Sequence, residues 1–163
     1  GEIQKVLAKL LRENVSIRNL PVIFETLADF SKMTNDTELL AEYVRQSLAS
    51  QITKQFVDQD ETLKVVTLSP DIETLFTNNI QQTEHGSYLA LDPAQQEQVI
   101  RSVQDEYEKL SLQYEQIVIL CSPTIRMYVK QMLERSFPQI AVLSYNELEP
   151  TVQVQSVGVV KVA

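Results

Sequence analysis

The chain has 163 residues, which is enough for one compact domain or two small ones, and 44% hydrophobic residues can supply a buried core. Three glycines are too few for a collagen-like chain or a glycine-rich phosphate loop, and one cysteine and one histidine exclude an intramolecular disulfide and a zinc site built from these residues. The net charge of −8 disfavours binding to nucleic acid or to an anionic membrane surface.

No run of residues approaches the roughly 18 consecutive apolar positions that a membrane-spanning helix needs. The first residues also lack the charged, apolar and small regions of a signal peptide. The chain begins at Gly1 and continues directly into a helical pattern. We therefore expect a fragment of a longer protein, with any membrane or targeting segment outside it.

Residues 1–57 show a helical pattern throughout, with apolar residues that recur three and four positions apart. Asn14 suits the end of a first helix, Pro21 suits the first turn of a second, and Asn35 with Glu38 resembles a capping box before a third. The three apolar stripes are Ile3, Val6, Leu7, Leu10 and Leu11; Ile23, Phe24, Leu27 and Phe30; and Leu39, Leu40, Tyr43, Val44, Leu48, Ile52 and Phe56. The pattern predicts a small helical bundle.

The acidic run 57–61 is the predicted boundary, which gives a helical subdomain at 1–57 and an α/β subdomain at 58–163. Beyond it, a β-rich run ends in Ser or Asp followed by Pro and a helical pattern, and this happens three times. Ser or Asp can accept a hydrogen bond from a free N–H at the helix start, and Pro suits the next position. The three runs are Val65–Leu68 before Ser69-Pro70, Tyr88–Leu91 before Asp92-Pro93, and Ile117–Cys121 before Ser122-Pro123.

Further apolar runs at Ile140–Leu143 and Val152–Val160 suggest closing strands. Strands that alternate with helices are typical of an α/β domain. The expected fold is therefore mixed α and α/β, with a small helical bundle followed by an α/β subdomain.

The charge is divided unevenly between the two predicted subdomains. Residues 1–57 hold seven basic and seven acidic side chains, and the remainder holds seven basic and fifteen acidic ones. An acidic surface on the second subdomain would favour a basic partner and would act less strongly in salt. The alternative is a solvated surface that only keeps the protein soluble.

Two residues could in principle carry nucleophilic or acid–base chemistry. His85 lies in a polar loop beside Glu84, where adjacent residues do not hold the geometry of a general base and its orienting partner. Cys121 ends an apolar strand before a helix, yet the only histidine is far away in sequence, so we interpret the cysteine as a small buried hydrophobe. The sequence predicts no catalytic residue.

Ligands of α/β folds bind at the carboxyl ends of strands, next to helix N-termini. Here each such turn carries proline where a phosphate cradle would need glycine and free N–H groups. Paired acids such as Asp105-Glu106 and Glu147 with Glu149 suit a solvated face or loop. We therefore expect no cofactor and no metal, and a nucleotide- or metabolite-binding α/β enzyme domain is the alternative function.

The helical half is the most specific part of the sequence. Residues 2–30, EIQKVLAKLLRENVSIRNLPVIFETLADF, closely resemble the cytoplasmic C-terminal region of the flagellar type III export gate proteins, the FlhA family, which virulence injectisomes share. Residues 39–52, LLAEYVRQSLASQI, are similar to the same family, and residues 143–148, LSYNEL, resemble its final α/β subdomain. The resemblance spans essentially the whole chain and is flagellar in its details.

The resemblance implies the third and fourth subdomains of an export gate that is not an enzyme. The parent would be a multi-pass protein of the bacterial inner membrane, with this part on the cytoplasmic face in a nonameric ring. Its partners would be flagellar export chaperones with their substrates and soluble export-apparatus proteins such as the stalk and the ATPase complex. The family's chaperone pocket lies in earlier subdomains, so no pocket residue is carried over. A purely structural ring segment is a further alternative.

The expected protein-interface residues are charged side chains on faces that the apolar stripes leave free. They are Arg12, Glu13, Glu42 and Arg45 in the helical half, for a ring neighbour, and Asp105, Glu106 and Glu108 in the acidic half, for a basic partner. Exposed charge pairs of this kind contribute only about 0–1 kcal/mol each.

Overall fold

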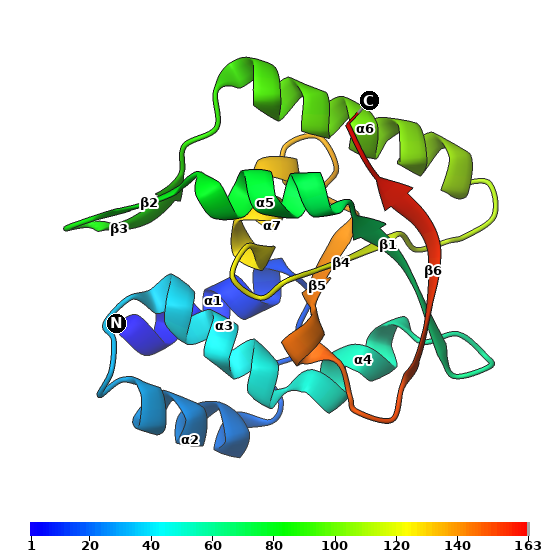
Figure 1. The fold of residues 1–163 in the computed structure, drawn as a ribbon. Coiled ribbons are helices and arrows are strands. Elements are labelled where there is room, and N and C mark those ends of the chain that lie inside the picture. Colours follow the sequence, from blue (N-terminus) through cyan, green and yellow to red (C-terminus); the bar gives the residue numbers. More distant parts are fainter. Residues whose placement is uncertain (163) are drawn as a thin grey trace. The chain divides into compact units, whose positions relative to one another are not determined.

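The computed structural model describes residues 1–162 and confirms the mixed α and α/β fold (Figure 1). The chain divides into two compact units. The helical unit consists of Gly1–Gln55 with Asn146–Pro150, and the sheet unit consists of Phe56–Tyr145 with the described residues from Thr151 onward. Within residues 1–162, no helix combines the length and the apolar character needed to cross a membrane.

The helical unit contains four helices, and α3 packs against both α1 and α2. The helices are α1 (Glu2–Arg12), α2 (Leu20–Phe30), α3 (Thr37–Ser47) and α4 (Ala49–Phe56). The predicted end of the first helix is confirmed, since Asn14 takes a left-handed φ of 61° just after α1. Pro21 lies in the first turn of α2, as predicted.

Two details of the third predicted helix are wrong. Its N-cap is Asp36 and not Asn35, because the Asp36 carboxylate accepts the backbone N–H of Glu38 at 2.9 Å. The helix is also not continuous, since Leu48 departs from helical geometry (φ −100°, ψ 20°) and separates α3 from α4. The side chain of Leu48 is nevertheless buried, so the apolar stripe continues across the break.

The buried face of α1 is narrower than its apolar stripe. Val6 and Leu10 are fully buried, whereas Ile3 and Leu11 are half-exposed. The core of the helical unit comprises Val6, Leu10, Val15, Ile23, Leu27, Leu40, Ala41, Val44, Leu48 and Ile52. Part of the apolar surface predicted to be core therefore faces solvent in this chain.

The sheet unit is built on a four-stranded, all-parallel sheet in the order β5-β4-β1-β6. Its strands are β1 (Thr62–Leu68), β4 (Val118–Cys121), β5 (Ala141–Ser144) and β6 (Gln153–Val160). The helices are α5 (Pro70–Asn78), α6 (Pro93–Leu110) and α7 (Arg126–Leu133), and the short 3-10 turn η1 (Tyr145–Glu147) follows β5. Contacts of α6 with β6 and of α7 with β5 close the core of this unit.

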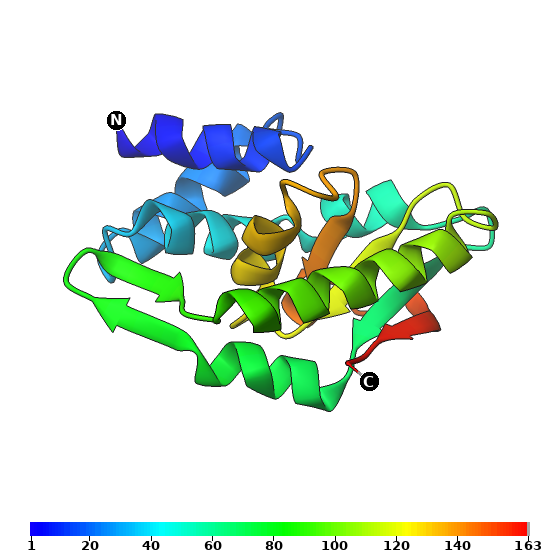
Figure 2. The same cartoon turned by 90° about the horizontal axis from the view of Figure 1, so that it is seen from above.

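Of the three predicted strand-proline-helix repeats, the first is confirmed in full. Ser69 caps α5 by accepting the Ile72 N–H. In the second, Asp92 and Gln95 form the predicted capping box of α6, but the preceding strand does not join the parallel sheet. That strand, β3 (Gly86–Leu89), pairs with β2 (Ile80–Thr83) in an antiparallel hairpin that projects beyond α5 (Figures 1 and 2).

The third repeat departs from the prediction at its cap. The helix α7 begins at Arg126 with Ile125 as N-cap and without a side-chain cap hydrogen bond. Ser122 lies three residues too early to cap it, because residues 123–125 form a turn before the helix, in which the Ile125 N–H donates to the Ser122 carbonyl at 3.3 Å. The side chain of Ser122 is used elsewhere, as described below.

The buried and exposed leucines of α1 give a matched pair of variants. Leu10 is 1% exposed and Leu11 is 53% exposed. We expect Leu10→Ala to lower the free energy of unfolding by about 2–5 kcal/mol through a cavity in the helical unit. Leu11→Ala should change it by no more than about 0.5 kcal/mol. Urea denaturation followed by circular dichroism measures both, and equal losses would contradict the assigned buried face.

Candidate functional site

The carboxyl edge of the parallel sheet, where an α/β enzyme would bind its ligand, is closed by a carboxylate of the chain. Glu73 from the first turn of α5 accepts the Ser122 hydroxyl at 2.7 Å and the Ser122 backbone N–H at 3.1 Å. The hydroxyls of Ser122 and Thr124 lie 3.5 Å apart. Because Glu73 already occupies these donors and carries negative charge, this edge is unsuited to a phosphate group.

Tyr145, which follows β5, is electrostatically coupled to the same edge. Partial burial raises the pKa of its phenol above the ordinary value, and electrostatic interaction with Glu73 and then with Cys121 raises it further. The side chain of Cys121 itself is fully buried, as expected of a small hydrophobe. His85 is exposed in the turn of the β2–β3 hairpin. Within residues 1–162, no group of three or more His, Cys, Asp or Glu side chains could hold a metal ion.

The charged residues predicted to face a ring neighbour do not share an exposed face. Arg12 is exposed and Glu13 is partly buried at the end of α1, whereas Glu42 and Arg45 of α3 are buried. The prediction that Glu42 and Arg45 lie on an exposed face is therefore wrong. Leu40 and Val44 of the predicted apolar stripe are buried as expected, but the apolar pattern does not indicate that the buried side of α3 also carries charges.

Arg45 instead holds a residue 102 positions away in sequence. Its Nε lies 2.8 Å from Glu147 Oε2 and its Nη2 lies 2.9 Å from Glu147 Oε1, so the contact is bidentate. Arg45 is 3% exposed and Glu147 is 1% exposed. Glu13 Oε1 lies 3.5 Å from Arg45 Nη1. The prediction of a solvated Glu147 is therefore wrong, and the contact with Arg45 could not be predicted because no local pattern links the two residues.

The three acidic residues predicted on α6 differ in exposure. Asp105 and Glu108 are exposed, whereas Glu106 is partly buried. A Cβ atom at Gly158 of β6 would lie 2.9 Å from Glu106 Oε2 and 3.1 Å from a methyl group of Leu110. Glu106 therefore covers the strand and is less free to meet a partner than the other two acids.

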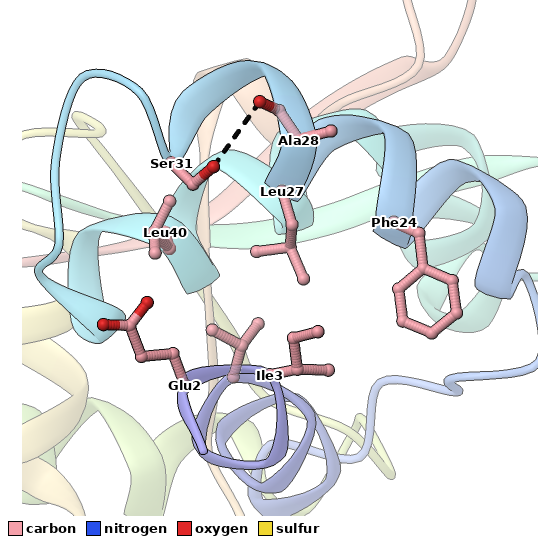
Figure 3. A pocket seen from close by; sticks show the side chains of 8 residues that line it. Glu2, Ile3, Phe24, Leu27, Ala28, Ser31 and Leu40 are labelled. Carbon is pink, nitrogen blue, oxygen red and sulfur yellow. Dashed lines mark hydrogen bonds between the residues drawn. The ribbon is translucent and has the colours of Figure 1, made fainter.

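An apolar groove of about 370 Å³ lies between α1 and α2 in the helical unit (Figure 3). The half-exposed side chains of Ile3 and Phe24 form its rim, and buried Leu27 and Leu40 form part of its floor. The complete lining is Glu2, Ile3, Val6, Phe24, Leu27, Ala28, Ser31 and Leu40. Five of the eight belong to the predicted apolar stripes, whose spacing alone could not show that some members would stay uncovered: Ile3, Val6, Phe24, Leu27 and Leu40.

The profile of the FHIPEP family matches residues 1–153 of the chain. The chain is 60% identical over 162 residues to "Flagellar biosynthesis protein FlhA" of Bacillus subtilis (strain 168), which covers 99% of this chain and 24% of that protein. It therefore spans about a quarter of the length of this curated relative.

Two solved structures resemble the fold closely. One is the "Cryo-EM structure of nonameric EPEC SctV-C", with a TM-score of 0.83 and 38% identity over 98% of this chain and 48% of that one. The other is the "Structure of the Chlamydia pneumoniae CdsV and CdsO protein complex", with a TM-score of 0.87 and 32% identity over 98% of this chain and 47% of that one.

The coupling of Tyr145 to Glu73 predicts a shifted titration. Because the folded-state pKa is raised, the unfolded chain ionises this tyrosine first, so the stability that this group contributes is lost as the pH rises through that pKa. NMR titration should place the pKa of Tyr145 above the ordinary value of 10.0. Glu73→Gln should lower it only partly, since burial is the larger cause. Glu97→Gln on α6 serves as control and should leave it unchanged; an equal shift would exclude a local effect of Glu73.

Proposed function

The chain belongs to the FHIPEP family, and we propose that it forms part of the cytoplasmic portion of a flagellar type III export gate. The 60% identity with the flagellar relative carries this proposal, since SctV-C and CdsV are 38% and 32% identical. The parent would be a multi-pass protein of the inner membrane. In it, this region would help dock chaperone–substrate complexes and soluble export-machinery proteins within a ring.

The apolar groove of the helical unit is the surface that we assign to a neighbouring copy in that ring. The nonameric state of SctV-C supports self-association in a relative of the same fold. The rim residues Ile3 and Phe24 offer apolar area, and burying apolar area drives association more effectively than exposed ion pairs do. Of the charged residues predicted for this contact, Arg12 remains exposed, at the opposite end of α1 from Glu2 and Ile3.

The exposed acids of α6 are the surface that we assign to a basic component of the export machinery. Asp105 and Glu108 lie on the part of α6 that also covers β6, and both are exposed. The solved complex of CdsV with CdsO supports a second protein as partner of a protein of this fold. A charged surface of this kind acts mainly on the rate of association. Chaperone–substrate complexes would contact the parent chiefly through the earlier subdomains that the family resemblance implies.

A chimera tests the export-gate function in a complete protein. This chain would replace the matching segment of Bacillus subtilis FlhA, and we expect restored flagellin secretion and swimming. Phe24→Asp should abolish both and prevent ring assembly of the cytoplasmic region, because a carboxylate in the groove would lose its hydration on contact.

Met33→Asp is the matched control, because Met33 is exposed and does not line the groove. This variant should keep ring assembly and motility. A stable, membrane-inserted chimera that exports nothing would contradict the proposed function. Export that survives Phe24→Asp would reject only the groove as the ring contact.

The acidic surface predicts salt-dependent binding to a basic stalk protein. Asp105→Lys with Glu108→Lys should slow association several-fold at low salt and flatten its decrease between about 0.05 and about 0.3 M salt. Glu84→Lys with Glu115→Lys makes the same change in net charge at exposed positions of the sheet unit outside α6 and should have a smaller effect. Surface plasmon resonance measures both pairs. Equal effects would show that only net charge matters, and binding insensitive to salt would rule out the acidic surface.

A further inference from the structure

Residues 146–150 belong to the helical unit, although the residues on both sides of them belong to the sheet unit. We call residues 146–150 the strap. The chain passes from one unit to the other after residues 55, 145 and 150. Two of these three crossings flank the strap. Whether the strap is attached to the helices therefore decides whether the units are connected by three crossings or by one.

The strap is attached to the helices by polar contacts of buried groups. Arg45 of α3 holds the Glu147 carboxylate in the bidentate contact described above. Thr53 of α4 donates its hydroxyl to the Glu147 carbonyl at 3.1 Å and accepts the Glu149 N–H at 2.9 Å. One arginine and one threonine, from two helices, therefore fix both the side chain and the backbone of the strap.

Apolar packing contributes little to this attachment. Leu148, the strap's one large apolar side chain, is only half-buried, and Asn146 and Pro150 are exposed. None of the five strap residues belongs to the buried apolar core of either unit. Segments held by few apolar contacts open locally at lower cost than the core does. The strap can thus leave the helices without exposing the buried leucines and valines beneath them.

We propose that the strap is a releasable clamp, closed by the Arg45–Glu147 ion pair, that couples the helical unit to the sheet unit. With the clamp closed, three chain crossings join two folded units and they unfold as one. With the clamp open, the strap is no longer attached to the helices. Only the crossing after residue 55 then joins a folded part of the helical unit to the sheet unit, and the two units unfold independently. The clamp would act in this way whatever partner the chain binds.

The chemistry of the pair suits a clamp with one closed position. A guanidinium that meets a carboxylate through two parallel hydrogen bonds permits one orientation, so the strap closes in a single register. Removing the charge of Glu147 leaves the buried Arg45 guanidinium with less compensation, since its ion pair with Glu13 is longer, at 3.5 Å, and this favours opening. Thr53 adds neutral hydrogen bonds that can be removed without disturbing the ion pair.

Hydrogen exchange of the full chain, followed by mass spectrometry, tests the clamp. Glu147→Gln should speed exchange of the strap amides by about tenfold or more, and should speed exchange in α1, α2, β1 and β4 by less than in the strap. Thr53→Val preserves volume and both charges, and should give a smaller increase confined to the strap. This second variant decides the matter if Glu147→Gln does not fold.

Lys9→Gln is the matched control, since it breaks the partly exposed Lys9–Glu38 pair, 3.2 Å long, within the same helical unit. It should leave exchange of the strap unchanged. The proposal is overturned if Thr53→Val and Glu147→Gln speed exchange in α1 and α2 as much as in the strap, because the contacts would then only support the bundle. Unchanged strap rates in both variants would also overturn it.

Calorimetry tests the coupling itself. The unaltered chain and the Lys9→Gln control should unfold in one transition, and Glu147→Gln should unfold in two. Two transitions in the unaltered chain would overturn the proposal, as would a single transition at lower temperature in Glu147→Gln.

Discussion

The buried ion pair of Arg45 and Glu147 holds residues 146–150 in the helical unit, although the residues before and after them in the chain belong to the sheet unit. Removing both charges from water is costly, and the cost is offset here by two short hydrogen bonds and by the nearby carboxylate of Glu13. Arg45 is buried on α3, the helix that packs against both α1 and α2. The helical unit is therefore completed by residues from near the end of the chain.

This arrangement changes where the negative charge of the chain lies. Counted by structural unit, the helical unit holds seven basic and nine acidic side chains, and the sheet unit holds seven and thirteen. Glu147 belongs to the first count and is neutralised by Arg45. The charge that remains available to steer a partner sits on exposed positions such as Asp105 and Glu108, whereas Glu106 serves mainly to cover Gly158.

Two surfaces of different physical character follow from the fold. The groove bordered by Ile3 and Phe24 acts only on contact, because apolar burial has no long-range component. The acids of α6 act over about a Debye length, roughly 8–10 Å at physiological salt, and so influence encounter before contact. The export gate that we propose, which would hold neighbouring copies in place while it receives other proteins, would use both kinds of surface. The sheet edge offers neither, since Glu73 fills it with the chain's own carboxylate.

The sequence by itself determined the features whose causes lie within a few residues. The end of α1 at Asn14, Pro21 at the start of α2, and the Asp92–Gln95 capping box depend on local backbone geometry, and all three were predicted. The mixed fold was predicted because the helical spacing of apolar residues before residues 57–61 gives way to alternating β-rich and helical runs after them. Only the tertiary structure decided that β3 pairs in a hairpin, that Ser122 serves Glu73 rather than a helix, and that Arg45 meets Glu147. These contacts join residues up to 102 positions apart, and periodicity, which records only whether a side chain faces inward, carries no information about which partner it meets there.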